Sequence, residues 1–191
     1  IFLSIDFDFW NYSQDTFDYW IRYFVTYGKK HKIPITAVTN HQQMLRHVDA
    51  NKARILVNLD THSDLVSKDV TIFDCGSWVS YVKWRKQGTY VWMHAGPTLE
   101  GDCSSFRGGD FFCAHDEHKI DYSDTDWKKL KRNYVNPEKN IFAEKTIPSI
   151  IKYTAHISFC TSPGYTYSHL LKDGKNILKY YSIPILRGRL D

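Results

Sequence analysis

Two short apolar runs that each end in a cluster of carboxylates constrain this chain more than any other feature. The first run, Ile1 to Ile5, leads into Asp6-Phe7-Asp8, and the second, Ile55 to Leu59, leads into Asp60-Thr61-His62-Ser63-Asp64. Runs of this kind predict buried strands. Unpaired carboxylates at the end of a buried strand lose hydration at a large cost in free energy. Both clusters therefore predict a compensating positive charge, which a metal ion can supply.

The spacing within each cluster supports a metal site. Side chains two residues apart in an extended segment point to the same side, so Asp6 would act with Asp8, and Asp60 with His62. Asp64 would return to the same point from the following turn. Four carboxylates and one imidazole form a mostly hard ligand set, which suits Mn²⁺ or Mg²⁺ better than a closed structural Zn²⁺ site. So many negative ligands favour two ions over one.

The order of predicted elements is typical of an α/β domain with a mainly parallel sheet. Strands are predicted at 2–7, 33–39, 55–59, 90–93 and 153–160, and helices at 16–27, 42–50, 78–87 and 168–181. An irregular segment at about 95–126, rich in glycine and polar residues, is expected to form a rim or lid. Since we find no internal repeat and no linker, we expect residues 1–191 to form a single domain.

Histidines follow two further predicted strands. In an open parallel sheet, ligands bind outside the carboxyl ends of the strands. His41 follows the second predicted strand and His94 the fourth, so both would lie at the same edge as the acidic clusters. We therefore predict that His41 is a metal ligand. His94 is either a satisfied polar residue at the rim or a group of the substrate pocket or proton shuttle, and both interpretations stay open.

Composition argues against several classes of protein. A hydrophobic content of 42% predicts a folded core, and no apolar run approaches the length of a membrane span. The four cysteines form no C-x-x-C pair, which favours a reducing cytoplasm over a disulfide framework. The net charge of +4 is spread over several basic stretches without a DNA- or RNA-binding motif. We therefore expect neither a nucleic-acid nor a membrane partner.

Other conspicuous residues have plainer interpretations. His115-Asp116-Glu117-His118 has the composition of a metal site but falls in a polar loop, so we expect it to be solvated. The cysteines are expected to be small buried residues without a catalytic role, and the tryptophans to belong mainly to the core. Trp10 is the exception, because it follows Asp8 toward the expected mouth of the site.

The two acidic motifs resemble those of the arginase and deacetylase (ureohydrolase) superfamily. Ser4-Ile5-Asp6-Phe7-Asp8 resembles its S-x-D-x-D element, and Asp60-Thr61-His62-Ser63-Asp64 resembles its D-x-H-x-D element. His41 resembles the lone histidine that completes the first metal site. The resemblance implies two manganese ions in a three-layer α/β/α fold. It also implies six ligands: Asp6 and Asp60 as bridges, His41 and Asp64 at one ion, and Asp8 and His62 at the other.

Three further segments are similar to the branch of the superfamily that contains the peptide arginases. They are Asp74 to Trp78, Val91 to His94 and Ser162 to Tyr165. Enzymes of that branch convert arginine side chains of ribosomally made precursor peptides to ornithine and release urea. The resemblance implies this activity here, with an arginine-containing precursor peptide as partner. Asp64, which would assist the attacking hydroxide, and His94 are then the candidate catalytic residues.

The chain departs from ordinary arginases in the order of its motifs. In those enzymes D-x-H-x-D precedes S-x-D-x-D, whereas here it follows, so an arginase-like fold has to be rewired or circularly permuted. No counterpart of the arginase glutamate that receives the guanidinium is evident. Two alternatives stay open: a metal-dependent deacetylase or amidinohydrolase that acts on a small molecule, and a metal-stabilised module that binds a peptide without chemistry.

Overall fold

Strands and short helices alternate through the part of the chain that the computed structural model describes, residues 1–12, 14–48, 54–62, 64, 76–82, 88–93, 109–113 and 147–187. The strands are β1 (Phe2–Asp6), β2 (Ile35–Val38), β3 (Ile55–Leu59), β4 (Gly88–Met93), β5 (Gly109–Cys113), β6 (His156–Cys160) and β7 (Ile185–Leu186). The α-helices are α1 (Phe17–Lys30) and α3 (Ser168–Tyr180), and a helical turn covers 147–151. The 3₁₀ helices are η1 (Phe7–Tyr12), η2 (Gln14–Thr16), η3 (His41–Arg46) and η4 (Trp78–Tyr81).

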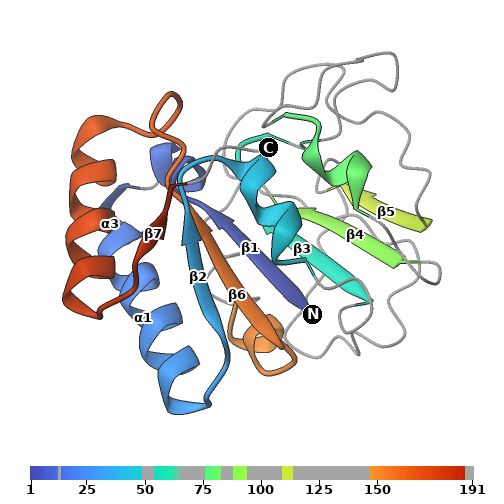
Figure 1. Cartoon of the computed structure of the whole chain (residues 1–191), viewed down its shortest axis with the longest axis horizontal. Helices are drawn as coiled ribbons and strands as arrows, with labels where there is room; N and C mark the ends of the chain where they lie inside the picture. The colour runs from blue at the N-terminus through green and yellow to red at the C-terminus, as the bar shows by residue number, and fades with distance from the viewer. Residues whose placement is uncertain are drawn as a thin grey trace.

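The strands form one seven-stranded sheet in the order β5-β4-β3-β1-β6-β2-β7. Every neighbouring pair is parallel. The first strand of the chain, β1, lies at the centre between β3 and β6 (Figure 1). Because all strands run in the same direction, their carboxyl ends meet at one edge of the sheet. The predicted α/β domain with a parallel sheet is confirmed.

The two faces of the sheet carry separate hydrophobic cores. The helices α1 and α3 lie on one face (Figure 1), where Phe24 of α1 packs in the same core as Leu3 of β1. On the other face, Met44 of η3 and Trp78 of η4 share a core with Phe2. Helical segments therefore cover both faces, which is compatible with a three-layer α/β/α arrangement.

Side-chain alternation decides where the acidic residues at the strand ends point. Ile5 of β1 and Leu59 of β3 both belong to the core under α1. Since successive side chains of a strand point to opposite faces, Asp6 and Asp60 turn toward the face that carries η3. Both carboxylates are almost fully buried, with 2% and 1% exposure.

The first helix is longer than the sequence pattern predicts. Instead of ending near Tyr27, α1 continues through Gly28 to Lys30. A Cβ atom at Gly28 would lie 2.7 Å from Cδ1 of Ile35, so the glycine allows α1 to approach β2 closely. Gly28 is thus a packing residue within the helix rather than its end.

Two other helix predictions are wrong in type or length. The segment predicted as a helix at 42–50 is the 3₁₀ helix η3, which begins at His41 and ends at Arg46. The segment predicted at 78–87 is the 3₁₀ helix η4, which ends at Tyr81, while 83–87 lie outside the described residues. A pattern of one or two turns contains too few apolar positions to distinguish a period of 3.6 residues from one of 3.0.

Two strands were not predicted. The strand β5 lies within the segment expected to be irregular and pairs with β4, and the rest of 95–126 lies outside the described residues. Its apolar run, Phe111 to Cys113, is short and follows two glycines, so it does not stand out from a loop. At the opposite edge, β7 has only two residues. In the described ranges, no helix combines the length and the apolar character needed to cross a bilayer.

Candidate metal centre

The register of the central strands brings the two acidic clusters together. Ile5 of β1 is paired with Leu59 of β3, so Asp6 and Asp60 leave neighbouring strands at the same level. His41 reaches the same edge as the first residue of η3, just after β2. The sequence separates these three elements widely, and only the parallel sheet makes them neighbours.

At this edge four buried side chains, His41, Asp6, Asp60 and Asp64, form an inner group in which the three carboxylates face one nitrogen of His41. The Nδ1 atom of His41 lies 3.2 Å from Oδ2 of Asp6, 3.1 Å from Oδ2 of Asp60 and 2.9 Å from Oδ2 of Asp64. None of the four side chains is more than 4% exposed. Neighbouring ligands of one six-coordinate ion, at about 2.1 Å from it, are about 3 Å apart, so these separations suit a shared cation.

Asp64 reaches the inner group because the chain turns back sharply, as its position in the motif predicts. Its φ angle of 54° lies in the left-handed region, which aspartate tolerates better than most residues do. Oδ2 of Asp64 accepts hydrogen bonds from Nε1 of Trp78 and, at 3.3 Å, from Nδ2 of Asn58. The same amide nitrogen of Asn58 donates to Oδ2 of Asp60 at 3.0 Å. Asn58 and Trp78 therefore orient the carboxylates without belonging to either acidic motif.

An outer group, Asp8, Asp60 and His62, lies beside the inner one. Nδ1 of His62 is 3.3 Å from Oδ2 of Asp8 and 3.7 Å from Oδ1 of Asp60. The His62 side chain is 36% exposed, and its ring lies 5.3 Å from that of Tyr165, centroid to centroid. Asp60 belongs to both groups through different oxygens, Oδ2 toward His41 and Oδ1 toward His62. This is the arrangement that a carboxylate bridging two ions requires.

The carboxylate of Asp6 is held by its own set of donors. Its Oδ1 accepts the backbone N–H of Asp8 at 3.0 Å, and its Oδ2 accepts a hydrogen bond from the hydroxyl of Ser162. Ser162 itself has a positive φ of 37° in the turn after β6. Among the described residues, Asp6 shares a possible ligand set with His41 and Cys160 but not with His62.

The ring of His41 is fixed from several sides. Its Nε2 lies 3.4 Å from the hydroxyl of Ser4, which donates to the sulfur of Met44 at 3.0 Å and is therefore free to accept from Nε2. The ring also stacks on that of Trp78, with centroids 5.5 Å apart. A proton on Nε2 leaves Nδ1, which faces the carboxylates, available as a ligand.

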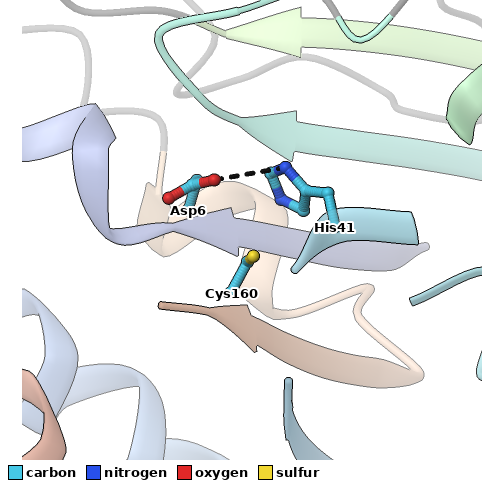
Figure 2. Close-up of side chains that lie close together, drawn as sticks. All are labelled: Asp6, His41 and Cys160. Carbon is cyan, nitrogen blue, oxygen red and sulfur yellow. Dashed lines mark ion pairs between the residues drawn. The ribbon is translucent and has the colours of Figure 1, made fainter. Parts of the chain in front are cut away.

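Cys160 is a neighbour of the inner group that the sequence did not reveal. Figure 2 shows its thiol close to Asp6 and His41, at the end of β6. The sulfur lies 3.1 Å from the hydroxyl of Ser162 and 3.6 Å from the carbonyl oxygen of Thr39. Burial raises the pKa of this thiol well above its ordinary value, so it stays protonated at neutral pH. The prediction of a small buried cysteine holds here, but its position beside metal-ligand candidates is new.

Several of these buried groups take up protons in place of a counter-ion. Burial, with the charge of Asp60, raises the pKa of Asp64 to about 7. Burial also raises the pKa of Asp6 and of Asp8, and neighbouring carboxylates add to the effect. Burial alone would raise the pKa of Asp60 too, but His41 and His62 hold it well below its usual range. Asp60 is therefore the carboxylate that stays ionised.

The two histidines respond to the same negative charge. Hydrogen bonds to Asp60 and Asp8 raise the pKa of His62 to about 11. Burial lowers the pKa of His41, but the surrounding acidic groups outweigh it and raise the pKa well above its ordinary value. Among the described residues, the ion pairs of these carboxylates involve only the two histidines, with no lysine or arginine. These buried Asp and His groups can hold a metal ion, which would replace the protons.

The six predicted ligands thus lie together, whereas other predicted candidates do not join them. Trp10 is buried in the core under α1, against Phe17, so the expectation that it lines the mouth of the site is wrong. The predicted catalytic candidate His94 and the loop from His115 to His118 lie outside the described residues. Of the site residues that sequence reasoning missed, Asn58 had a detectable signal, since it precedes Asp60 by two positions and so shares its face of β3.

Comparison of the chain with protein-family models, curated proteins and solved structures gives no match. The interpretation of the site therefore rests on its own geometry and on the resemblance of the two acidic motifs.

Proposed function

We propose that this chain is a dinuclear, manganese-dependent hydrolase that converts arginine side chains of a ribosomally made precursor peptide to ornithine and releases urea. The observation that carries the proposal is the position of Asp60, which directs one carboxylate oxygen toward the inner group and the other toward the outer group. A single-ion site has no need for this division. Two adjacent ligand sets with a common carboxylate are expected of a two-metal hydrolase.

In this proposal the inner and outer groups would each hold one Mn²⁺. When bound, the two ions would lower the pKa of a water molecule so that hydroxide is available at neutral pH. Asp60 would bridge, fixed by Asn58. The resemblance implies Asp6 as the second bridge, whereas Asp6 here groups with His41 and Cys160 and not with the outer group. Asp64 would assist the attacking water. The donor to the leaving amine is not assigned, and His94 is the candidate catalytic residue to test for that role.

The chemistry of the site also suits a guanidinium substrate. Beside the outer group, the ring of His62, whose side chain is 36% exposed, lies next to the ring of Tyr165, a residue that is 55% exposed. A planar guanidinium can stack on such an aromatic ring.

One observation favours a single-ion variant as the second candidate. The inner group is closed, and its three carboxylate oxygens lie within 3.2 Å of Nδ1 of His41. The outer group is more open, with 3.7 Å between Nδ1 of His62 and Oδ1 of Asp60. If only the inner group binds an ion, the site would match a deacetylase or amidinohydrolase that uses one metal ion and acts on a small molecule.

The test is incubation of the Mn²⁺-loaded protein with arginine-containing peptides and, in parallel, with free arginine. We expect urea release and the mass change of arginine to ornithine, with a much higher kcat/KM for arginine within a peptide. Asp60→Asn serves as the inactive control. Comparable kcat/KM for free arginine would return the protein to small-molecule ureohydrolases. Metal-dependent peptide binding without turnover would instead support a non-catalytic module.

A further inference from the structure

A cavity lies at the carboxyl edge of the sheet, next to the metal centre but separate from it. It has a volume of about 1010 Å³ and lies between the C-terminal part of α3, the strand β7 and the ends of β2 and β6. In Figure 1, α3 and β7 lie side by side at this border of the sheet. None of the six predicted metal ligands lines the cavity.

The cavity and the metal centre share the loops on which they are built. Thr39 and Asn40 line the cavity and directly precede His41, while Thr161 lines it and directly precedes Ser162, a donor to Asp6. The backbone N–H of Ser162 donates to the carbonyl oxygen of Thr39 at 3.1 Å, which ties the two loops together. A ligand in the cavity would therefore contact the outer side of loops that carry the metal centre.

All the described charged side chains that line the cavity are positive. Lys175 and Lys179 of α3 and Arg187 after β7 line it, and the described lining contains no aspartate or glutamate. Within the described part of the chain, none of these three cations takes part in an ion pair. Lys175 is half-buried, so its aliphatic stem lies along the wall while its ammonium group stays available to a ligand.

Five polar and three apolar residues complete the described lining; the polar ones are Thr39, Asn40, Gln43, Thr161 and Ser182. Thr161 is fully buried, and its hydroxyl has no hydrogen-bond partner within the described residues. The oxygen is also shielded from the cavity, so it does not itself offer a contact to a ligand there. Ile183, Pro184 and Ile185 form an apolar side. The strand β7 also ends the described sheet, so its outer edge is not covered by another described strand.

We propose that this cavity binds an acidic peptide segment, whose carboxylates contact Lys175, Lys179 and Arg187. The size favours a peptide over a single inorganic anion, because pockets of about 300–1,000 Å³ accommodate ligands of many atoms. An apolar wall beside three cations suits a segment that mixes acidic and aliphatic side chains. The inference rests on the cavity alone and does not depend on the proposed hydrolase activity.

The experiment measures fluorescence anisotropy of a labelled short peptide that alternates glutamate and leucine, with the glutamine analogue as the neutral probe. We expect the acidic peptide to bind and the neutral one to bind weakly, with an affinity that falls as salt increases. The double variant Lys175→Gln/Lys179→Gln should weaken binding about tenfold. Arg187→Gln should weaken it separately, which gives a second measurement if the double variant folds poorly.

The matched control is Lys172→Gln together with Lys152→Gln, because both lysines are exposed but do not line the cavity. Equal weakening by control and cavity variants would overturn the proposal, since binding would then reflect net charge alone. Complete displacement of the peptide by inorganic phosphate at equal concentration would also overturn it in favour of a simple anion site. Binding that persists in Asp60→Asn would separate this cavity from the metal centre, whereas its loss there would contradict the proposal.

Discussion

The inner and outer groups use the same residue types in different environments. The inner group is closed, with His41 and its three carboxylates at most 4% exposed, and with supporting contacts from Asn58 and Trp78. In the outer group the His62 side chain is 36% exposed and meets the exposed ring of Tyr165. Asp60 is common to both. If the two groups bind ions as proposed, this difference suits the inner group to retention of an ion and the outer group to access.

The contacts that hold the ligand side chains in place explain the difference between the closed inner group and the open outer group better than the identity of the ligands does. Metal-binding side chains are oriented by the groups that hydrogen-bond to them, and these groups influence metal affinity strongly. Nε2 of His41 faces the hydroxyl of Ser4 and its ring stacks on Trp78, whereas His62 has an aromatic contact with one exposed tyrosine. We therefore expect the inner group to bind metal more tightly than the outer group.

The largest expected effect comes from Asp60→Asn, which changes both groups at once. An amide supplies no negative charge to either ion, so we expect loss of the second ion and a loss of turnover greater than the roughly 100-fold typical of supporting residues. Metal analysis and urea release measure the two effects. Asp18→Asn, at an exposed ion pair with Arg22, is the matched control and should behave like the wild type. Retention of both ions by Asp60→Asn would mean that Asp60 is not the bridge.

Substitution of either histidine should have a smaller effect on metal binding, and the effects of the two substitutions should differ. His62→Gln should leave one tightly bound ion, because the inner group remains complete. His41→Gln should weaken the tighter of the two binding events, since it removes the donor that three carboxylates face. Calorimetric titration with Mn²⁺ distinguishes these results by stoichiometry and affinity. If His41→Gln spares the tight site, the assignment of inner and outer affinities is reversed.

A supporting residue should matter less than a ligand. Trp78→Phe keeps a ring beside His41 but removes the N–H that donates to Asp64. We expect metal affinity to fall by about 10–100-fold, as for other residues that orient a ligand. Trp20→Phe is the control, because Trp20 is also buried but lies in the core under α1. An equal loss of affinity in both variants would indicate a general packing defect instead.

The sequence predicted that the candidate ligands would meet at one edge of the sheet, because their positions follow from strand periodicity. Asp6 and Asp60 come at the ends of strands whose apolar runs are unambiguous, and parallel pairing then places them at one edge. The return of Asp64 toward the other carboxylates follows from its place in the turn after β3, two residues beyond His62. Even the contribution of His41, distant in sequence, follows from its position after β2.

The supporting residues and the cavity could not be predicted in the same way. Trp78 donates to Asp64 from η4, and its sequence pattern is too short to distinguish a 3₁₀ helix from an α-helix. Cys160 approaches His41 only because β6 lies between β1 and β2 in the sheet. The order of the strands depends on how all of them pair in the sheet, and a motif at the end of one strand does not predict it. Lys175 and Arg187 likewise meet only after β7 pairs with β2 at its edge.

The smallest effect is a pH dependence of stability in the protein stripped of metal with a chelator. Asp64 has a pKa raised to about 7 by burial, against 3.8 when unfolded, so the folded state holds its proton longer and loses stability as pH rises from about 4 to 7. Asp6 and Asp8 have raised pKa values and act in the same direction. Asp60, whose pKa is lowered in the folded state, opposes this trend only at the low end of the range, up to about pH 5, where its carboxyl is still partly protonated in the unfolded chain.

His62 extends the same trend to higher pH. Its pKa is raised from 6.5 to about 11 by Asp60 and Asp8, so its stabilising charge is fully present below about 6.5 and is lost as pH approaches 11. We therefore expect the Tm of the chelated protein to fall between about pH 4 and 11. Saturating Mn²⁺ should oppose this fall, because bound metal takes the place of the protons and its affinity increases with pH. The variant His62→Gln should make the upper part of the curve less steep, while the raised pKa of His41 still contributes a slope there. A Tm that rises with pH across the lower range in the chelated protein would show that the carboxylates repel one another less than their burial implies, and would weaken the case for a cation between the two groups.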